Sequence, residues 1–295
     1  MNIRALRSDL LLLLTACVWG FAFVAQKKGS AYIEPFYFNG IRFLMGGVSL
    51  VPFIAFRRSR GALKRSCALG KPLFLASLLA GSCLFIAASL QQIGIMSTTE
   101  GHSGFITGLY VVLTPIAGIF IGRKTGIPTW IGVTFTLVGL FFLCVADNVG
   151  QINSGDLLTL ISALFWTGHV LAIDKLVQKH DALLLSAGQF IWVGVFSLLI
   201  ALFRETISLT DIYDCLPPLL YSGLCSVGVA YTLQVVAQKE APPAHATIIM
   251  CLEGVFAAVG GVIFSGNILG TNTITGFVLM LCGMLLSQWD LIRQK

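Results

Sequence analysis

Charge is scarce in this sequence. Asp, Glu, Lys and Arg together make up 11% of the 295 residues, whereas about a quarter of the residues of an ordinary soluble domain are charged. Hydrophobic residues account for 56%. This composition excludes a typical soluble domain and predicts an integral membrane protein. The net charge of +6 does not indicate nucleic acid, because the basic residues cluster at the ends of apolar stretches, where they set the orientation of membrane helices.

Metal-binding and disulfide patterns are also lacking in the sequence. The eight cysteines include no C-x-x-C pair and no Cys/His spacing suited to zinc, and most of them lie inside apolar stretches as small packing residues. We therefore predict no metal and no cofactor. The N-terminal segment combines two arginines with an apolar run, but no A-x-A cleavage motif follows it. We expect the mature chain to keep this segment as its first span.

Long apolar stretches fill most of the chain. A helix needs about 20 apolar residues to cross a ~30 Å hydrocarbon layer, and ten stretches are interpreted as such spans, at 10–26, 35–56, 72–94, 102–121, 129–146, 157–177, 183–203, 216–237, 244–264 and 272–289. With the N-terminus in the cytoplasm, fifteen Lys and Arg residues fall on the cytoplasmic side and three on the other. Because cytoplasmic loops are enriched in Lys and Arg, this distribution predicts ten transmembrane helices with both termini in the cytoplasm.

The two halves of the chain resemble each other. Near-constant shifts of 147, 143 and 144 residues pair Trp19 with Trp166, Arg42 with Gln189, Gln91 with Gln234, His102 with His245, and Gly139 with Gly283. Five spans per copy is an odd number, so the second copy must be inverted relative to the first. The sequence thus predicts an all-α integral membrane fold built of two inverted five-helix repeats, 1–148 and 149–295.

Three segments carry the pattern of a known family: VWGFAFVAQK at 18–27, GFITGLYVVLTPIAGIFIG at 104–122 and LEGVFAAVGGVIF at 252–264. In these segments the chain resembles the drug/metabolite transporter superfamily, and in particular its EamA-type ten-helix transporters. The resemblance extends over essentially the whole chain. It implies a secondary transporter, and not an enzyme, that moves small amphipathic metabolites, often amino acids, by alternating access.

Glu253 lies in the middle of the ninth stretch, nine residues past Ala244. At about 1.5 Å per residue, its carboxyl is about 14 Å deep in the membrane. A carboxyl at that depth is costly and should face a protein interior or a water-filled cavity. We favour a functional acid that holds either a proton or a substrate ammonium group. A buried structural acid, neutral or paired with a base, is the alternative.

Several aromatic residues fall at the same depth. An inverted repeat places its substrate near the middle of the membrane, between the two copies. Trp19 and Trp166 each lie about 15 Å from an end of their helices and could line a cavity; packing between the first and sixth helices explains them equally well. Tyr110 could add a wall that stacks on the substrate. Phe23 could do the same, although packing is the preferred interpretation for Phe23.

Five further residues are candidates for proton transfer, gating or helix pairing. His169 could relay a proton, or it could be hydrogen-bonded within the bundle. Arg42 could bind a carboxylate, but a structural or helix-pairing role is favoured, because the resemblance implies that second spans lie outside the cavity. His102 and His245 open the fourth and ninth stretches on opposite sides of the membrane and are predicted to be gate or interface residues. Pro115 interrupts helical hydrogen bonding in mid-span and permits a hinge.

The leading interpretation is a carrier in the bacterial cytoplasmic (inner) membrane that exports amino-acid-like metabolites, with protons as the candidate coupling ion. An importer or exchanger of a nucleoside-type or other metabolite, with the same fold, is the alternative. An enzyme would need clustered acid–base or metal groups at a membrane face, and the short, basic cytoplasmic loops of this sequence offer no such cluster. A non-transporting scaffold would not explain the midplane carboxyl. The expected partners are a small-molecule substrate, the lipid bilayer and protons, without nucleic acid. Both a monomer and a homodimer are compatible with the sequence.

Overall fold

The computed structural model describes residues 3–61, 70–98, 100–144, 153–265 and 270–293, and every regular element in these ranges is helical. The chain therefore has the all-α fold that its composition predicts. The elements are α1 (Ile3–Gly29), α2 (Pro35–Ser49), α3 (Val51–Ser59), α4 (Lys71–Ser97), α5 (Glu100–Gly108), α6 (Tyr110–Phe120), α7 (Ile127–Cys144), α8 (Ser154–Leu176), α9 (Ala182–Arg204), α10 (Leu209–Asp214), α11 (Leu216–Leu220), a π-helical segment (Tyr221–Tyr231), α12 (Thr232–Ala237), α13 (Pro243–Met250), α14 (Glu253–Ser265) and α15 (Thr271–Arg293).

Seven helical stretches among the described residues are long and apolar enough to cross a membrane. Four of them are the single helices α1, α4, α8 and α9. Each of the other three consists of consecutive helical elements, and they extend over Pro35–Ser59, Leu216–Ala237 and Pro243–Phe264. Shorter apolar helices lie at Ile106–Phe120, Ile127–Phe142 and Ile274–Ser287. The protein is thus a multi-pass membrane protein.

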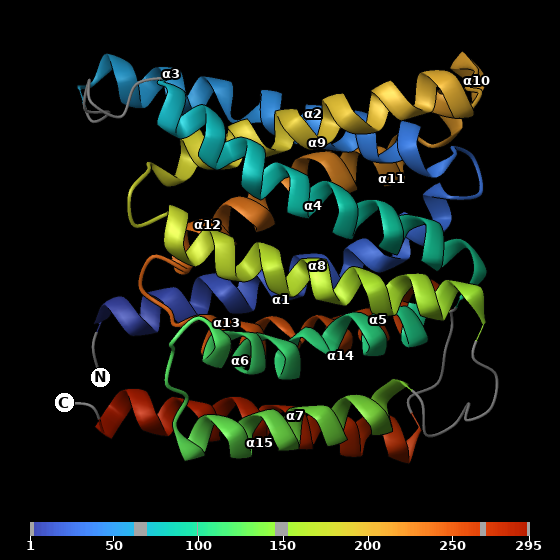
Figure 1. Ribbon diagram of the computed structural model, residues 1–295. Coiled ribbons are helices and arrows are strands. Elements are labelled where there is room, and N and C mark those ends of the chain that lie inside the picture. The colour runs from blue at the N-terminus through green and yellow to red at the C-terminus, as the bar shows by residue number, and fades with distance from the viewer. Residues whose placement is uncertain (1–2, 62–69, 99, 145–152, 266–269, 294–295) are drawn as a thin grey trace.

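Helices from the two halves of the chain pack against each other. α1 lies along α14 and the π-helical segment, α8 along α4, α2 along α9, and α7 along α15. Figure 1 shows α7 with α15 at one side of the bundle and α2 with α9 at the opposite side. The two halves are therefore interleaved, so residues that are far apart in sequence meet in the centre.

Glycines allow the closest of these contacts. A methyl group added at Gly132 of α7 would lie 2.7 Å from the carbonyl oxygen of Gly283 in α15. On α1, a methyl group added at Gly20 would overlap Phe256 and the backbone of Glu253. Small residues let membrane helices approach closely. Gly20 thereby holds α1 directly against the start of α14.

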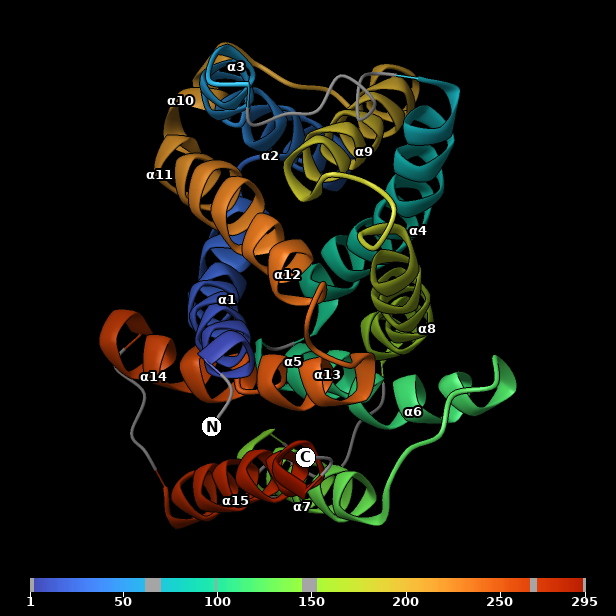
Figure 2. The same cartoon turned by 90° about the vertical axis from the view of Figure 1, so that its left-hand side faces the viewer.

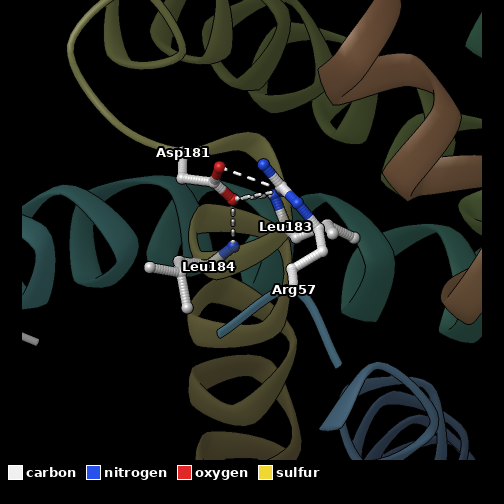
Figure 3. Close-up of polar contacts among 4 residues, drawn as sticks. All are labelled: Arg57, Asp181, Leu183 and Leu184. Carbon is white, nitrogen blue, oxygen red and sulfur yellow. Dashed lines mark hydrogen bonds and ion pairs between the residues drawn. The ribbon is translucent and has the colours of Figure 1, made fainter. Parts of the chain in front are cut away.

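Both termini lie at the same end of the bundle, together with the α8–α9 connection (Figure 1). An ion pair at this end joins Arg57 of α3 to Asp181, with 3.1 Å between Nη1 and Oδ2. Asp181 also accepts the N–H groups of Leu183 and Leu184 and so caps α9 (Figure 3). The connection between α8 and α9 is therefore held to the end of α3 by this ion pair.

At the opposite end, Glu205 follows α9 and caps a different helix. Its carboxylate accepts the N–H groups of Phe36 at 2.8 Å and Tyr37 at 2.7 Å, in the first turn of α2. Burial raises the pKa of Glu205, while these two hydrogen bonds act in the opposite direction. The cap joins α2 to α9 at the end away from the termini.

Candidate functional site

Two helical stretches in the centre are interrupted at matching places. α5 gives way to α6 at Leu109, and α13 gives way to α14 around Leu252, 143 residues later. In both, the leucine N–H bonds to the carbonyl three residues back, at 3.2 Å for Leu109 and 3.1 Å for Leu252, which makes a tighter turn than an α-helix. Discontinuous helices in transporters form substrate and ion sites. The interruptions therefore mark where a site should be sought.

Tyr110 and Glu253 are the first residues after these interruptions, and they too are 143 residues apart. The Tyr110 hydroxyl donates a hydrogen bond to Oε1 of Glu253 at 3.2 Å, and each residue is only 4% exposed. Two positions earlier, the Cys251 thiol donates to the Gly108 carbonyl at 3.3 Å. The carboxyl of Glu253 thus faces a partner from the other half of the chain and is shielded from lipid.

A cavity lies at this point. Viewed along the bundle, α1, α4, α8, α12 and α13 surround the centre (Figure 2), and the cavity is lined by Trp19, Ala22, Phe23, Gln26, Gln91, Thr107, Tyr110, Trp166, Val170, Ser226, Tyr231, Gln234, Met250 and Glu253. Among these described lining residues, only Glu253 has an acidic side chain. The space open to the centres of water molecules is about 30 Å³, and one water needs about 10–15 Å³. The cavity therefore fits a few waters, and helices must move apart to admit a metabolite.

Aromatic rings form one wall of the cavity. The ring of Tyr231 lies 4.6 Å from that of Trp19 and stacks at 5.9 Å on that of Trp166, measured between centroids. The Nε1 atoms of both tryptophans are buried and have no hydrogen-bond partner among the described residues. Buried polar groups are normally hydrogen-bonded. The two indole N–H groups are therefore available to acceptors on a ligand.

Amide side chains supply acceptors. The Nε2 group of Gln26 donates to the Ala22 carbonyl, and that of Gln234 donates to Oε1 of Gln238. The Oε1 atoms of Gln26 and Gln234 are buried and have no partner among the described residues. Gln91 donates to the Thr107 hydroxyl at 3.0 Å. These amides and Tyr231 were not predicted as site residues from the sequence. The matched pair Gln91 and Gln234 was the available signal.

The structure brings together Glu253, Trp19, Trp166, Tyr110 and Phe23, which all line the cavity. His169 is not among the lining residues. It lies behind Trp166, with its ring centroid 6.1 Å from that indole, and its Nε2 atom is hydrogen-bonded to Oε1 of Gln189 at 2.9 Å.

Arg42 also lies outside the lining. Its Nε group donates to Oδ1 of Asn39, one turn earlier in α2. Within the described residues, this hydrogen bond joins Arg42 to its own helix.

The predicted gate residues lie away from the cavity. His245, at the start of α13, has Nε2 within 2.9 Å of Oδ1 of Asp9 in α1 and Nδ1 within 3.2 Å of the Ser287 hydroxyl in α15. It thus joins three helices at the end of the bundle that carries the termini. The side chain of His102 lies outside the described part of the structure.

The helix interruption does not coincide with Pro115. α6 continues through this proline, and the tight turn falls earlier, at Leu109. The matching interruption at Leu252 occurs although Ala258 stands 143 residues after Pro115. Proline is therefore not the cause of these interruptions, and a hinge at Pro115 stays a prediction.

The described residues contain no group of three or more His, Cys, Asp or Glu side chains placed to hold a metal ion. The arrangement that they do contain is a small chamber with one acid, enclosed by helices from both halves of the chain. Broken helices around such a chamber are characteristic of secondary transporters. The fold and the site together define the class as a helical membrane transporter.

Comparison with known proteins gives the family. The EamA-like transporter family model matches residues 6–145 and again residues 153–289, and the chain belongs to this family. It is similar to an uncharacterized transporter of Archaeoglobus fulgidus, with 28% identity over 97% of this chain and 87% of that protein. It is also similar to the uncharacterized transporter YoaV of Bacillus subtilis, with 23% identity over 94% and 95%.

Two further comparisons bear on location and fold. The uncharacterized inner membrane transporter YedA of Escherichia coli is 26% identical over 50% of this chain and 47% of its own length. A crystal structure with 16% sequence identity superposes over 98% of both chains with a TM-score of 0.79. This likeness shows that the two proteins share a fold.

Proposed function

We propose that this protein is a secondary carrier that exports small amphipathic, amino-acid-like metabolites across the bacterial cytoplasmic membrane in exchange for protons. The observation that carries this proposal is the hydrogen bond between Tyr110 and Glu253. It joins two interrupted helices at matching positions beside a chamber lined by unpaired donors and acceptors. Membership of a family whose relatives are named as transporters supports the same conclusion.

In this proposal all seven long and three shorter apolar helices cross the membrane, as two inverted repeats, 1–148 and 149–295. The matching interruptions at Leu109 and Leu252 support this symmetry, because they are separated by a shift that also relates the two halves in sequence. Both termini lie in the cytoplasm. Their position at one end of the bundle, beside the basic connections, supports this orientation.

Glu253 is the coupling residue of the proposed cycle. Its carboxylate binds either a proton or the ammonium group of the substrate, and binding of one releases the other. The rings of Trp19, Trp166 and Tyr231 hold the apolar part of the substrate, while the free indole N–H groups and the glutamine oxygens accommodate its polar groups. Exchange of metabolite for proton then follows from competition for one acid.

Alternating access needs a closure at each end of the chamber. At the end with the termini, Asp9 of α1 is bonded to His245. At the other end, the Thr98 hydroxyl donates to Asp156 of α8, which stands 147 residues after Asp9. The two aspartates occupy matching positions in the two halves. We propose that the two contacts break in turn. Breaking the contact of Asp9 with His245 opens the chamber to the cytoplasm, and breaking the contact of Thr98 with Asp156 opens it to the outside.

The test is transport by purified protein in vesicles loaded with labelled amino acids, with efflux measured over a range of external pH. Glu253→Gln should abolish the pH dependence and lower the flux at least tenfold. Glu240→Gln, which makes the same chemical change at an exposed position between α12 and α13, should transport like the wild-type protein. Undiminished flux with Glu253→Gln would remove the role assigned to the acid. Comparison of metabolites inside and outside cells with and without the gene would identify the substrate.

A further inference from the structure

We propose that Arg42 binds the carboxylate of the transported metabolite. The substrate is then a dipolar amphipathic molecule, with its ammonium group at Glu253 and its carboxylate at Arg42. This assignment rests on the proposed transport function and adds a specificity-determining residue to the same site.

Arg42 is a buried cation that lacks a counterion. It is 1% exposed in the middle of α2, and no described carboxylate lies within ion-pair distance of it. A guanidinium stays charged, and a charge inside a membrane protein normally pairs with another group or marks a substrate pathway. The rings of Phe38 and Phe43 lie 5.5 and 5.0 Å from its Cζ atom, but neither ring is an anion, and a buried charge without a counterion is costly. An anion brought by the substrate supplies the missing partner.

The guanidinium is held in a fixed orientation. Its Nε group donates to Oδ1 of Asn39 at 2.9 Å, and the Asn39 amide in turn donates to the Ala88 carbonyl of α4 at 3.2 Å. Among the described residues, the hydrogen bond of the Arg42 side chain is the one made by Nε, and neither Nη group has a side-chain or backbone acceptor. These two groups are the pair with which a guanidinium binds a carboxylate in bidentate fashion. Asn39 thus orients Arg42 and leaves its binding groups free.

Arg42 lies directly behind the aromatic wall of the cavity. Its Cζ atom is 5.0 Å from the centroid of the Phe43 ring, and that ring is 5.9 Å from the ring of Tyr231, which lines the cavity. Tyr231 thus connects the ring that covers Arg42 to the cavity that Glu253 lines.

The two halves differ in the partner of the side chain at this position. The shift of 147 residues that pairs Trp19 with Trp166 also pairs Arg42 with Gln189 and Ala22 with His169. In the second half, Gln189 is bonded to His169. In the first half the place of the histidine is taken by Ala22, a short side chain that lines the cavity. Arg42 thus lacks the partner that Gln189 has, and a ligand reaches its guanidinium when the helices around the cavity move apart.

The test uses three compounds that share one phenyl group and differ in charge: phenylalanine, 2-phenylethylamine and 3-phenylpropionate. Their transport is measured in proteoliposomes containing the wild-type full-length chain, Arg42→Gln or Arg42→Lys. Arg42→Gln introduces the residue that occupies the matching position, Gln189, and is expected to fold. The KM for phenylalanine should rise about ten- to a hundredfold with Arg42→Gln, while the KM for 2-phenylethylamine changes less than about twofold. Arg42→Lys keeps the positive charge but lacks the two parallel N–H donors, and its KM for phenylalanine should lie between those of the wild-type protein and Arg42→Gln.

Each outcome bears on a different statement. Equal loss of phenylalanine and 2-phenylethylamine transport with both variants would show a structural role for Arg42 and overturn the assignment. An unchanged preference for phenylalanine over 2-phenylethylamine would overturn it too. If Arg42→Gln does not insert, the same comparison is made with Arg42→Lys alone. Wild-type protein that transports none of the three compounds would contradict the proposed transport function itself. Loss of phenylalanine transport alone supports the assignment.

Discussion

At the scale of single residues, the site depends on a difference between two matching positions. Glu253 and Tyr110 follow the same interruption in the two halves, and one is an acid while the other is a phenol. Two carboxylates at this distance would repel each other, and one of them would remain protonated. A phenol instead donates a hydrogen bond to the acid. The site therefore has a single acid, which suits competition between one proton and one ammonium group.

The two indole N–H groups of the cavity lead to a prediction at this scale. Trp19→Phe and Trp166→Phe keep an aromatic ring in the wall but remove a donor that has no protein partner among the described residues. Loss of one hydrogen bond is worth about 0.5–1.5 kcal/mol, so the KM for substrate should rise by about two- to tenfold with little change in thermal stability. Trp192→Phe is the control, because this ring packs against Phe74 and Phe196 outside the cavity. Unchanged KM in both cavity variants would contradict a role for the indole groups in binding.

At the scale of helices, the position of Glu253 is set by a contact between α1 and α14. Gly20 has no side chain, and the start of α14 occupies the space in which one would lie. The tight turn at Leu252 places the acid at the beginning of a new helix. Together, the close contact and the turn direct Glu253 toward the chamber.

This packing predicts opposite results for two similar substitutions. Gly20→Ala forces a methyl group into the backbone of α14 and should destabilise the protein by about 1–3 kcal/mol. Gly168→Ala in α8 adds the same methyl group where no atom lies within 4 Å, and it should be neutral or slightly stabilising, because alanine is the better helix former. Thermal unfolding in detergent measures both. A variant Gly20→Ala as stable as Gly168→Ala would mean that α1 and α14 are not held in this close contact.

At the scale of the whole molecule, the interleaving of the two halves governs how the carrier can move. α1 packs on α14, and α8 packs on α4, so neither half is a separate body that could tilt alone. The ion pair between Arg57 and Asp181 adds a link between the halves at one end (Figure 3). Opening at either end must therefore separate helices of one half from helices of the other.

The orientation gives a prediction at this scale. Reporters active on only one side of the membrane, fused to the N-terminus and to the C-terminus, should both report the cytoplasm. A reporter inserted in the connection after Arg204, at the opposite end of the bundle, should report the outside and serves as the control. Termini on different sides would contradict an even number of spans, and with it the two inverted repeats.

Several properties followed from the sequence alone. The scarcity of charge and the apolar stretches predicted an all-helical membrane protein, and the motifs predicted the EamA family; both are confirmed. Ten spans and the inverted repeat stay predictions. The depth of Glu253, Trp19 and Trp166, which follows from a constant rise per residue of a helix, also stays a prediction.

Only the tertiary structure decided which side chains meet. A membrane helix is apolar both where it faces lipid and where it faces protein, so its sequence lacks the polar stripe that would reveal its inward face. The pairing of Tyr110 with Glu253, the place of Tyr231 in the wall, the position of His169 behind Trp166 and the isolation of Arg42 therefore could not be deduced from sequence. They depend on how each helix is rotated about its axis, and the packing of the two interleaved halves fixes that rotation.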